Sequence, residues 1–489
     1  MYRVRADSIA SLYGVAATRR IEQAAAATLR VHTLMQRAGL AVARLAMALA
    51  PHARTIWIAC GPGNNGGDGF EAAARLRERG FAPIVSCVGD EARLPPDARA
   101  SLARARAAGV AFSDAPPDAF DLAIDALLGI GATRPPEGTM AVWLQRMHAG
   151  PAPVLAVDVP SGLDADTGRL AIDFIASSAG GAGAAARFCL SLLTLKPGLF
   201  TAQGRDAAGQ VWFDDLACAS ASEAPAARLT GAPATVPRAH ASHKGSYGDV
   251  AVIGGASGMA GAALLAASAA LHAGAGRVFV GLLDGRAAAL DAAQPELMLR
   301  DPRALDLSGM TTVCGCGGGD AVRALLPRVL STAPRAVLDA DALNAIAADT
   351  SLQTLLRARA RRGVATVLTP HPLEASRLLG CDTTAVQADR LAAARELASR
   401  FGAVVVLKGS GSVIAAEGEI PCINPTGNAW LATAGTGDVL AGMVGAALAA
   451  GRPGFDAACE AVWRHGALAD RWPADRPLTA GALARSGYP

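Results

Sequence analysis

Asp438 is the residue of this chain best placed to do chemistry, because two spaced glycines, Gly435 and Gly437, come just before it. The apolar residues after it predict the buried start of a helix. Glycines let backbone N–H groups approach an anion closely, and a helix start attracts negative charge. A carboxylate that stays ionised there could take a proton from a hydroxyl as the hydroxyl attacks a phosphate. The stretch therefore predicts phosphoryl transfer.

Three further polar clusters each follow a predicted strand in the C-terminal half. Lys408–Ser412 offers a cation and backbone donors suited to a nucleotide's phosphate or ribose. The other two clusters are Asp339–Asn344 and Thr369–Glu374. Because parallel strands bind ligands at their carboxyl ends, we expect all three clusters to meet Asp438 at one edge of a sheet.

Simpler interpretations exist for some of these residues. His371 lies between two prolines and could be a turn residue only. Asp339 and Asp341 could cap the next helix, or they could hold Mg²⁺ through water. Cys314 and Cys316 could indicate metal or redox chemistry, but no second Cys/His pair with zinc-ligand spacing accompanies them.

A second polar edge is predicted in the N-terminal half. The apolar run 55–60 predicts a buried strand, the glycine-rich run 61–69 a loop, and residues 70–79 a helix, which together make the first unit of a doubly wound sheet. The oxygens and amides of the loop suit a polar ligand or a monovalent cation. Asp125 and Asp158 also end predicted strands, although both could merely cap turns.

Length and composition set the limits. At 489 residues, 52% of them hydrophobic, the chain fits two α/β domains. We expect domains at 1–216 and 240–489, with an Ala/Ser/Pro-rich linker at 217–239. A net charge of +3 does not indicate a nucleic-acid or membrane partner. Nine scattered cysteines, and an N-terminus without signal-peptide character, favour a cytoplasmic protein with reduced thiols.

The C-terminal half resembles the ADP- or ATP-dependent NAD(P)H-hydrate dehydratases, a branch of the ribokinase-like kinases. The resemblance rests on the motifs NPTGN, TAGTGD, KGSGS, TPHPLE and LDADALN. It implies a ribokinase-like α/β/α fold, Mg²⁺ with ADP as cofactor, and Asp438 as the base that deprotonates the substrate's C6 hydroxyl. It further implies ADP contacts from Lys408, Gly409, Ser410, Gly411, Ser412 and Gly437, and contacts to the hydrated nucleotide from Ala262, Gly317, His371 and Asp438.

Residues 1 to 215 resemble the NAD(P)H-hydrate epimerases, which implies a Rossmann-like three-layer α/β/α domain. By that likeness Asn65, Asp125 and Ser161 would bind K⁺. The hydrate would contact Asn64, Asn65, Gly66, Gly67, Asp68, Gly129, Ile130, Gly131, Ala132, Thr133, Arg134, Pro135 and Asp158. Asp158 would serve acid/base catalysis at C6, through ring opening or a dehydrated iminium, and Lys196 could balance its charge.

The two resemblances together predict a bifunctional repair enzyme for the hydrated forms of NADH and NADPH, called NADHX and NADPHX. The enzyme would use ADP and yield NAD(P)H, AMP and phosphate. We expect a homo-oligomer. The chain departs from the dehydratase pattern at Asn428–Leu431 and at Gly315–Gly319, so the preferred phosphate donor stays open. One alternative is a ribokinase-like sugar or vitamin-precursor kinase. Another keeps the second activity but makes the first domain a binding module without catalysis.

Overall fold

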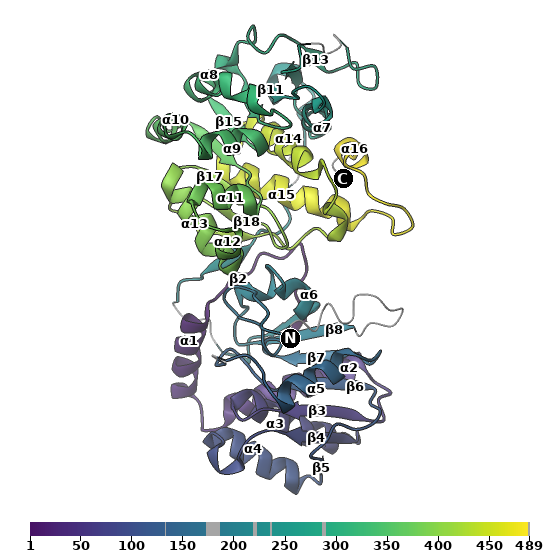
Figure 1. The fold of residues 1–489 in the computed structure, drawn as a ribbon. Coiled ribbons are helices and arrows are strands. Elements are labelled where there is room, and N and C mark those ends of the chain that lie inside the picture. The colour runs from purple at the N-terminus through teal and green to yellow at the C-terminus, as the bar shows by residue number, and fades with distance from the viewer. Residues whose placement is uncertain (133, 173–185, 219–222, 235–236, 286–289, 488–489) are drawn as a thin grey trace. The chain divides into compact units, whose positions relative to one another are not determined.

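The chain forms two compact units in a computed structural model, which describes all residues except 133, 173–185, 219–222, 235–236, 286–289 and 488–489 (Figure 1). One unit comprises Met1–Arg5 and Ser11–Ala227, and the other comprises Ala6–Ala10 and Arg228–Pro489. Part of the segment expected to be a linker is a strand, since β10 (Ala227–Leu229) pairs in parallel with β19 (Cys422–Ile423).

The described residues of the first unit include an 8-stranded sheet in the order β1-β9-β8-β7-β6-β3-β4-β5. Neighbouring strands are parallel except β1 and β9. β3 lies between β4 and β6, so the order of the strands reverses at β3 and β6. The connections that follow these two strands run to opposite sides, which leaves a crevice at their carboxyl ends. The strands are β1 (Tyr2–Arg3), β3 (Ile56–Cys60), β4 (Pro83–Cys87), β5 (Ala111–Phe112), β6 (Leu122–Ala126), β7 (Val154–Val157), β8 (Arg187–Leu192) and β9 (Gln210–Asp214); β2 (Ser11–Leu12) lies outside this sheet.

Helices cover both faces of this sheet, because alternate strand residues point to opposite sides. Ile56 and Ile58 of β3 share a core with α2 and α3, whereas Trp57 and Ala59 belong to a core that contains Trp143 of α5. The helices are α1 (Val15–Thr28), α2 (Thr33–Leu49), α3 (Asn64–Glu78), α4 (Pro96–Ala107), α5 (Thr139–His148) and α6 (Gly204–Ala208).

One expectation for the first unit was wrong. The glycine-rich run is not a loop throughout, because α3 already begins at Asn64. Its glycines are needed for close packing: a Cβ on Gly66 would lie 2.0 Å from the carbonyl oxygen of Gly61.

The sheet of the second unit runs in the order β13-β12-β11-β14-β15-β16-β17-β18-β19-β10. It is parallel from β13 to β17, β18 pairs antiparallel with both of its neighbours, and β19 pairs in parallel with β10. The remaining strands are β11 (Asp249–Gly254), β12 (Arg277–Leu282), β13 (Met298–Leu299), β14 (Thr311–Cys314), β15 (Arg335–Leu338), β16 (Ala365–Leu368), β17 (Val404–Leu407) and β18 (Val413–Ala415).

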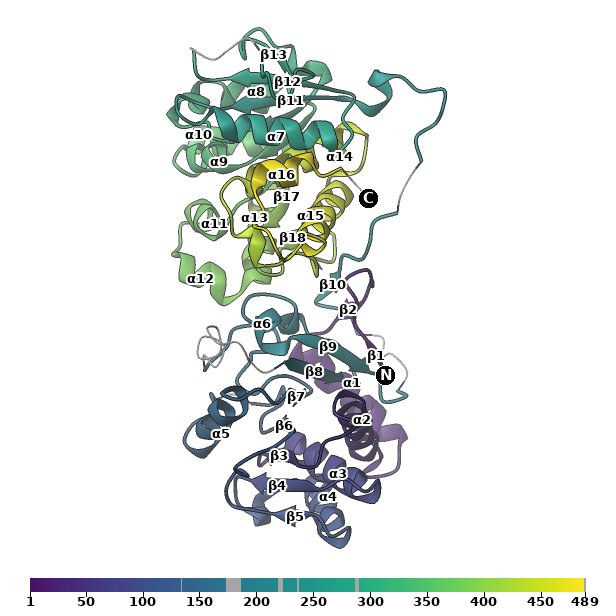
Figure 2. The ribbon, with the colours of Figure 1, turned by 90° about the vertical axis from the view of Figure 1, so that its right-hand side faces the viewer.

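Two groups of helices enclose this sheet, which confirms the predicted three-layer α/β class (Figures 1 and 2). Alanines of α7 and α14 pack on valines of the central strands, so the layers approach through small side chains. Helices α7 (Ala260–His272), α14 (Thr436–Ala449), α15 (Gly454–Asp470) and α16 (Ala480–Arg485) form one group; α8 (Leu326–Thr332), α9 (Ala340–Ala347), α10 (Thr350–Arg361), α11 (Pro372–Leu379), α12 (Thr383–Ala388) and α13 (Arg390–Phe401) form the other. Among the described residues, no helix combines the length and the apolar character needed to cross a bilayer.

Candidate active sites

The polar clusters predicted to meet in the second unit do meet, around Asp339. This residue directly follows β15, and its Oδ1 accepts hydrogen bonds from Lys408 Nζ at 2.7 Å and from Thr369 Oγ1 at 2.8 Å. Lys408 Nζ also lies 4.0 Å from Glu374 Oε2. The carboxyl ends of β15, β16 and β17 therefore contribute to one site.

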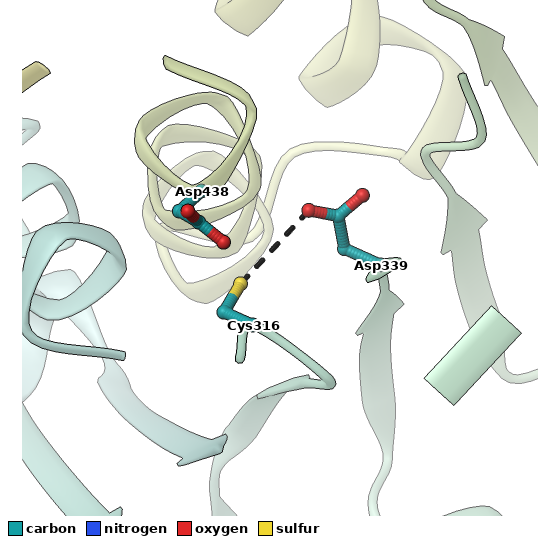
Figure 3. Close-up of side chains that lie close together, drawn as sticks. All are labelled: Cys316, Asp339 and Asp438. Carbon is teal, nitrogen blue, oxygen red and sulfur yellow. Dashed lines mark hydrogen bonds between the residues drawn. The ribbon is translucent and has the colours of Figure 1, made fainter. Parts of the chain in front are cut away.

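Asp438 reaches the same site from the first turn of α14. Figure 3 shows the side chains of Cys316, Asp339 and Asp438 close together, and one potential ligand atom from each lies within 4.8 Å of the others. The Cys316 thiol donates to Asp339 Oδ2 at 3.9 Å. A Cβ on Gly437 would come within 3.3 Å of Lys408 Nζ, so the lysine ammonium lies against the start of the helix.

Charge and burial oppose each other at this site. Burial raises the pKa of Asp438 to about 6, with Asp339 as a further raising cause, while Cys316 and Lys408 lower it. The helix start therefore does not keep Asp438 as acidic as expected, since it shares a half-buried site with other carboxylates. Burial acts to lower the pKa of Lys408, but Asp339 and Glu374 raise it on balance. The lysine stays a cation, and Asp438 can exchange a proton near neutral pH.

The structure tests the simpler interpretations of Asp339, Asp341 and His371. Asp339 makes no side-chain cap hydrogen bond at the start of α9, and Asp341 Oδ2 accepts from Gly319 N at 2.8 Å, so capping does not explain either carboxylate. His371 does cap α11, because its Nδ1 accepts from the backbone N–H of Leu373 at 3.1 Å. Its side chain is 46% exposed, and its Nε2 lies 3.1 Å from Glu374 Oε1.

The other predicted residues of this unit frame the site. Gly317 has φ +57°, and a Cβ on it would come within 2.9 Å of Ala262 Cβ, so these two predicted residues are neighbours. In the run 408–412, Gly409 and Ser410 are exposed, Gly411 is buried, and Ser412 Oγ donates to Gly409 O at 3.2 Å. Sequence reasoning missed buried Arg390, which donates to Lys408 O at 3.1 Å.

The first unit contains a cavity of about 740 Å³ at the crevice beside β3 and β6. Of the residues predicted to contact a substrate, Asn64, Asn65, Asp68, Gly129, Ile130, Gly131, Ala132 and Asp158 line it. Gly66 and Gly67 do not line it, because they are buried in α3. Arg134 and Pro135, which are exposed, do not line it either. Thr133 lies outside the described residues.

Asp158 projects into this cavity from a strained turn after β7. Its φ is +66°, which a residue other than glycine seldom adopts. The fully buried Lys196 donates to Asp158 Oδ1, and Leu192 N donates to the same oxygen at 3.2 Å. The lysine considered as a charge partner for Asp158 is therefore in contact with it.

Of the three residues predicted to bind K⁺, Asn65 lines the cavity, whereas Asp125 and Ser161 are buried and absent from its lining. Ser161 Oγ donates to Asp125 Oδ1 at 2.6 Å, and Leu128 N donates to Ser161 Oγ at 2.8 Å. Burial raises the pKa of Asp125. Asn65 lies against Gly129, and within the part of the chain that the structure describes its Nδ2 is buried without a hydrogen-bond partner.

Glu22 is a cavity residue that sequence reasoning missed. It lies on α1 and lines the cavity together with Thr18 and Arg19. Burial raises the pKa of Glu22, with Asp158 as the next cause, and burial also raises the pKa of Asp68 well above its ordinary value. No signal in the sequence indicates Glu22, because it neither follows a strand nor belongs to a glycine-rich run.

Known proteins resemble both units. Family models match residues 250–486, described as NAD(P)H-hydrate dehydratase, and residues 31–198, described as YjeF-related protein N-terminus. The dehydratase-like half is 45% identical over 254 residues to the ADP-dependent (S)-NAD(P)H-hydrate dehydratase of Neisseria meningitidis, covering 50% of this chain and 84% of the relative. A solved structure of a Bacillus subtilis ADP/ATP-dependent NAD(P)H-hydrate dehydratase with ATP/Mg²⁺ matches 51% of this chain and 90% of its own, at 31% identity and a TM-score of 0.42.

Relatives that carry both halves extend the match to most of the chain. The bifunctional NAD(P)H-hydrate repair enzyme Nnr of Escherichia coli is 37% identical over 460 residues, covering 90% of this chain and 85% of the relative. The protein of the same description from Coxiella burnetii is 33% identical, covering 94% of this chain and 93% of the relative. At this identity and coverage, the chain belongs to the family of bifunctional NAD(P)H-hydrate repair enzymes.

Proposed function

We propose that this chain repairs hydrated nicotinamide nucleotides with two activities. The second unit dehydrates the S epimer of NADHX or NADPHX at the expense of ADP, which yields NAD(P)H, AMP and phosphate. The first unit interconverts the R and S epimers and so supplies the second with its substrate. The dehydratase activity rests on one observation: Lys408, Asp339 and Asp438 meet at one edge of the sheet.

In the dehydratase unit, Asp438 takes the proton of the C6 hydroxyl as that oxygen attacks the terminal phosphorus of ADP. The bond from this phosphorus to AMP breaks, and the phosphate ester then eliminates inorganic phosphate, which restores the dihydropyridine ring. Lys408 and the amides at the start of α14 stabilise the negative charge on the phosphate. Residues 409–412 hold the nucleotide, and Ala262, Gly317 and His371 hold the hydrate.

The carboxylates of this site fit Mg²⁺ bound with the nucleotide. Carboxylate oxygens of Asp339 and Asp438 lie within 4.8 Å of each other, a donor set that suits a hard cation. Asp339 and Asp341 would hold the ion through water. Mg²⁺ neutralises phosphate charge when it is bound.

In the epimerase unit, Asp158 acts as base and Glu22 as acid. Lys196 forms an ion pair with the Asp158 carboxylate, whereas burial raises the pKa of Glu22 and so favours its protonated form. Two carboxyl groups in different environments can divide acid and base roles at one carbon. Asn65, Asp125 and Ser161 fit K⁺, because their side chains offer hard oxygen donors and Asp125 Oδ1 lies 2.6 Å from Ser161 Oγ. We further propose a cytoplasmic homo-oligomer, whose size light scattering would measure.

A mixture of both NADHX epimers tests the proposal when it is incubated with the full chain and ADP, or ATP in a parallel reaction. Complete return of absorbance at 340 nm is expected. If the absorbance at 340 nm stops rising when the S epimer is exhausted, the first unit is a binding module without catalysis. A stable phosphorylated product without recovery at 340 nm would instead indicate a kinase. Omission of K⁺ should slow epimer interchange and leave dehydration of the S epimer unchanged.

A further inference from the structure

Arg19 is a side chain at the cavity of the first unit to which the proposed reaction assigns no role. It lies on α1, and of the described residues that line the cavity it alone carries a positive charge. The same lining contains the carboxyl groups of Glu22, Asp68, Asp97 and Asp158. NADHX and NADPHX bring further negative charge, because each contains a diphosphate. The diphosphate is therefore best placed where it meets the cation of this cavity.

Arg19 differs from the next residue, Arg20, in what its guanidinium contacts. Arg20 Nε and Nη2 donate to the two carboxylate oxygens of Glu223 at 3.0 and 2.8 Å. Arg19 is exposed, and within the described part of the chain it forms neither a hydrogen bond nor an ion pair. The guanidinium of Arg19 is therefore available to a ligand in the cavity, whereas that of Arg20 is not.

The guanidinium of Arg19 lies beside the loop that follows β6. A Cβ on Gly131 would come within 3.8 Å of Arg19 Nη2. Two residues earlier, a Cβ on Gly129 would come within 3.2 Å of Oδ1 of Asn65, which belongs to the first turn of α3. No side chain caps the start of α3. The loop thus has a cation on one side and uncapped backbone N–H groups on the other, and both attract an anion.

The position of Arg19 on α1 indicates which phosphate it can reach. Glu22 follows Arg19 by about one helical turn, which places their Cβ atoms about 5–6 Å apart on one face. Because Glu22 is the proposed acid at C6, a substrate group that reaches Arg19 must lie near the nicotinamide end. The diphosphate lies closer to that end than the 2′-phosphate of NADPHX, which is carried by the adenosine ribose.

We propose that Arg19 binds the diphosphate of the hydrated nucleotide, across the loop 129–131 from the start of α3. The planar guanidinium can donate two parallel hydrogen bonds to phosphate oxygens, and it stays protonated at every pH at which the enzyme is folded. Arg19 is therefore a binding residue and exchanges no proton with C6. The assignment rests on the proposed function of the first unit, because Glu22 gives the orientation of the substrate.

The first test measures epimer interchange by chromatography in the full chain without ADP, so that dehydration does not consume the substrate. Arg19→Met should raise KM for both NADHX and NADPHX roughly 10- to 100-fold, the usual effect of losing a hydrogen bond between charged groups, and should change kcat little. Arg20→Met is the matched control. It removes the same charge from the adjacent position, where Arg20 contacts Glu223, and should leave KM unchanged.

A substrate without phosphate separates the proposed contact from a general effect on the cavity. Hydrated, reduced nicotinamide riboside contains the reacting ring but no diphosphate. Its interchange should proceed with the same kcat/KM in Arg19→Met as in the unmodified chain. Arg19→Lys, which keeps the charge but not the planar fork, should recover part of the affinity for NADHX.

A labelling experiment tests the contact without relying on turnover. Phenylglyoxal modifies exposed arginines, so mass spectrometry should find it on Arg19 in the ligand-free chain. NADHX should protect Arg19 but not Arg79, which is exposed and does not line the cavity. The phosphate-free nucleoside should protect Arg19 less at the same concentration. Protection without interchange of the epimers would support the role of Arg19 and refute the proposed epimerase activity.

Three outcomes would overturn the proposal. The first is an equal KM in Arg19→Met and Arg20→Met. The second is a loss of affinity confined to NADPHX, which would assign Arg19 to the 2′-phosphate. The third is labelling of Arg19 that NADHX does not change. The first two outcomes leave the epimerase activity standing, because both require that the epimers interchange.

Discussion

Lys408 and Asp339 form an ion pair at the rim of the second sheet, with Nζ 2.7 Å from Oδ1, although 69 positions separate them in the chain. The pair also sets the electrostatics of Asp438. Lys408 lowers the pKa of Asp438 and Asp339 raises it, against a background of burial that brings it to about 6. The proposed base therefore lies among charged neighbours whose effects on its pKa oppose one another.

The pair predicts the pH dependence of dehydration. Asp438 must be ionised to accept a proton, so kcat/KM for the S epimer should fall as pH drops below about 6. Asp339→Asn removes a negative charge and should move this acid limb to lower pH. Lys408→Met removes a positive charge and should move it to higher pH, whatever it does to nucleotide affinity. Initial rates at 340 nm across pH 5 to 8 measure the limb.

A variant of Glu374 is the control, because Glu374 is another acid in the cluster that could produce the same pH dependence. Burial raises the pKa of Glu374 to about 7, so Glu374 titrates in the same range. Glu374→Gln should leave an acid limb near pH 6. Loss of the limb in that variant, or shifts of the same sign in Asp339→Asn and Lys408→Met, would assign the ionisation to a group other than Asp438.

Asp438→Asn should lower the dehydration rate by about 10² to 10⁴, the usual contribution of a positioned acid or base. Interchange of the epimers should continue, because that reaction belongs to the first unit. The melting temperature should not fall, since a neutral amide suits a half-buried position that already disfavours the carboxylate. Chromatography separates the epimers and absorbance at 340 nm follows the product; undiminished recovery would remove Asp438 from the reaction.

The strands could be predicted from the sequence because each is a continuous apolar run that ends in polar or glycine residues. The strand predicted over 55–60 is β3, and β15, β16 and β17 end directly before the three polar clusters, as expected. Parallel order then predicted that the clusters after β15, β16 and β17 would share an edge, which the contacts of Asp339 confirm.

The remaining features depend on packing between distant segments. Glycine disfavours helices intrinsically, so the local sequence does not predict that α3 begins at Asn64, where Gly66 packs closely against Gly61. Glu22 reaches the cavity from a helix that precedes the sheet, and no local pattern predicts that approach. The pKa of Asp438 depends on burial among other carboxylates, which a motif does not reveal.

Lys196→Met should impair the epimerase unit alone. Lys196 is fully buried and the Asp158 side chain is only 14% exposed, so loss of the cation leaves a carboxylate unpaired in a poorly solvated place. Breaking such a pair costs roughly 3–5 kcal/mol of the free energy of unfolding. Epimer interchange should fall sharply while dehydration of the S epimer continues.

The double variant Lys196→Met, Asp158→Asn separates stability from catalysis. Removing the second charge should restore most of the lost stability in denaturant unfolding, but epimer interchange should stay lost. Recovery of interchange in the double variant would show that Asp158 is structural and that another group acts on C6.

His465 should make the second unit sensitive to acid. It is buried on α15, its Nε2 donates to Thr436 O at 2.9 Å, and burial lowers its pKa to about 4. The unfolded chain takes up a proton near pH 6.5 that the folded chain refuses until about pH 4. This contribution to stability is therefore complete above pH 6.5 and is lost as the pH falls, by about 2 kcal/mol between pH 7 and pH 5.

His465→Gln keeps a donor for Thr436 O but does not titrate, so its unfolding should depend less on pH. Pulsed hydrogen exchange in urea, read on peptides of α14 and α15, isolates the second unit, and equal pH dependence in the two chains would contradict a buried neutral His465.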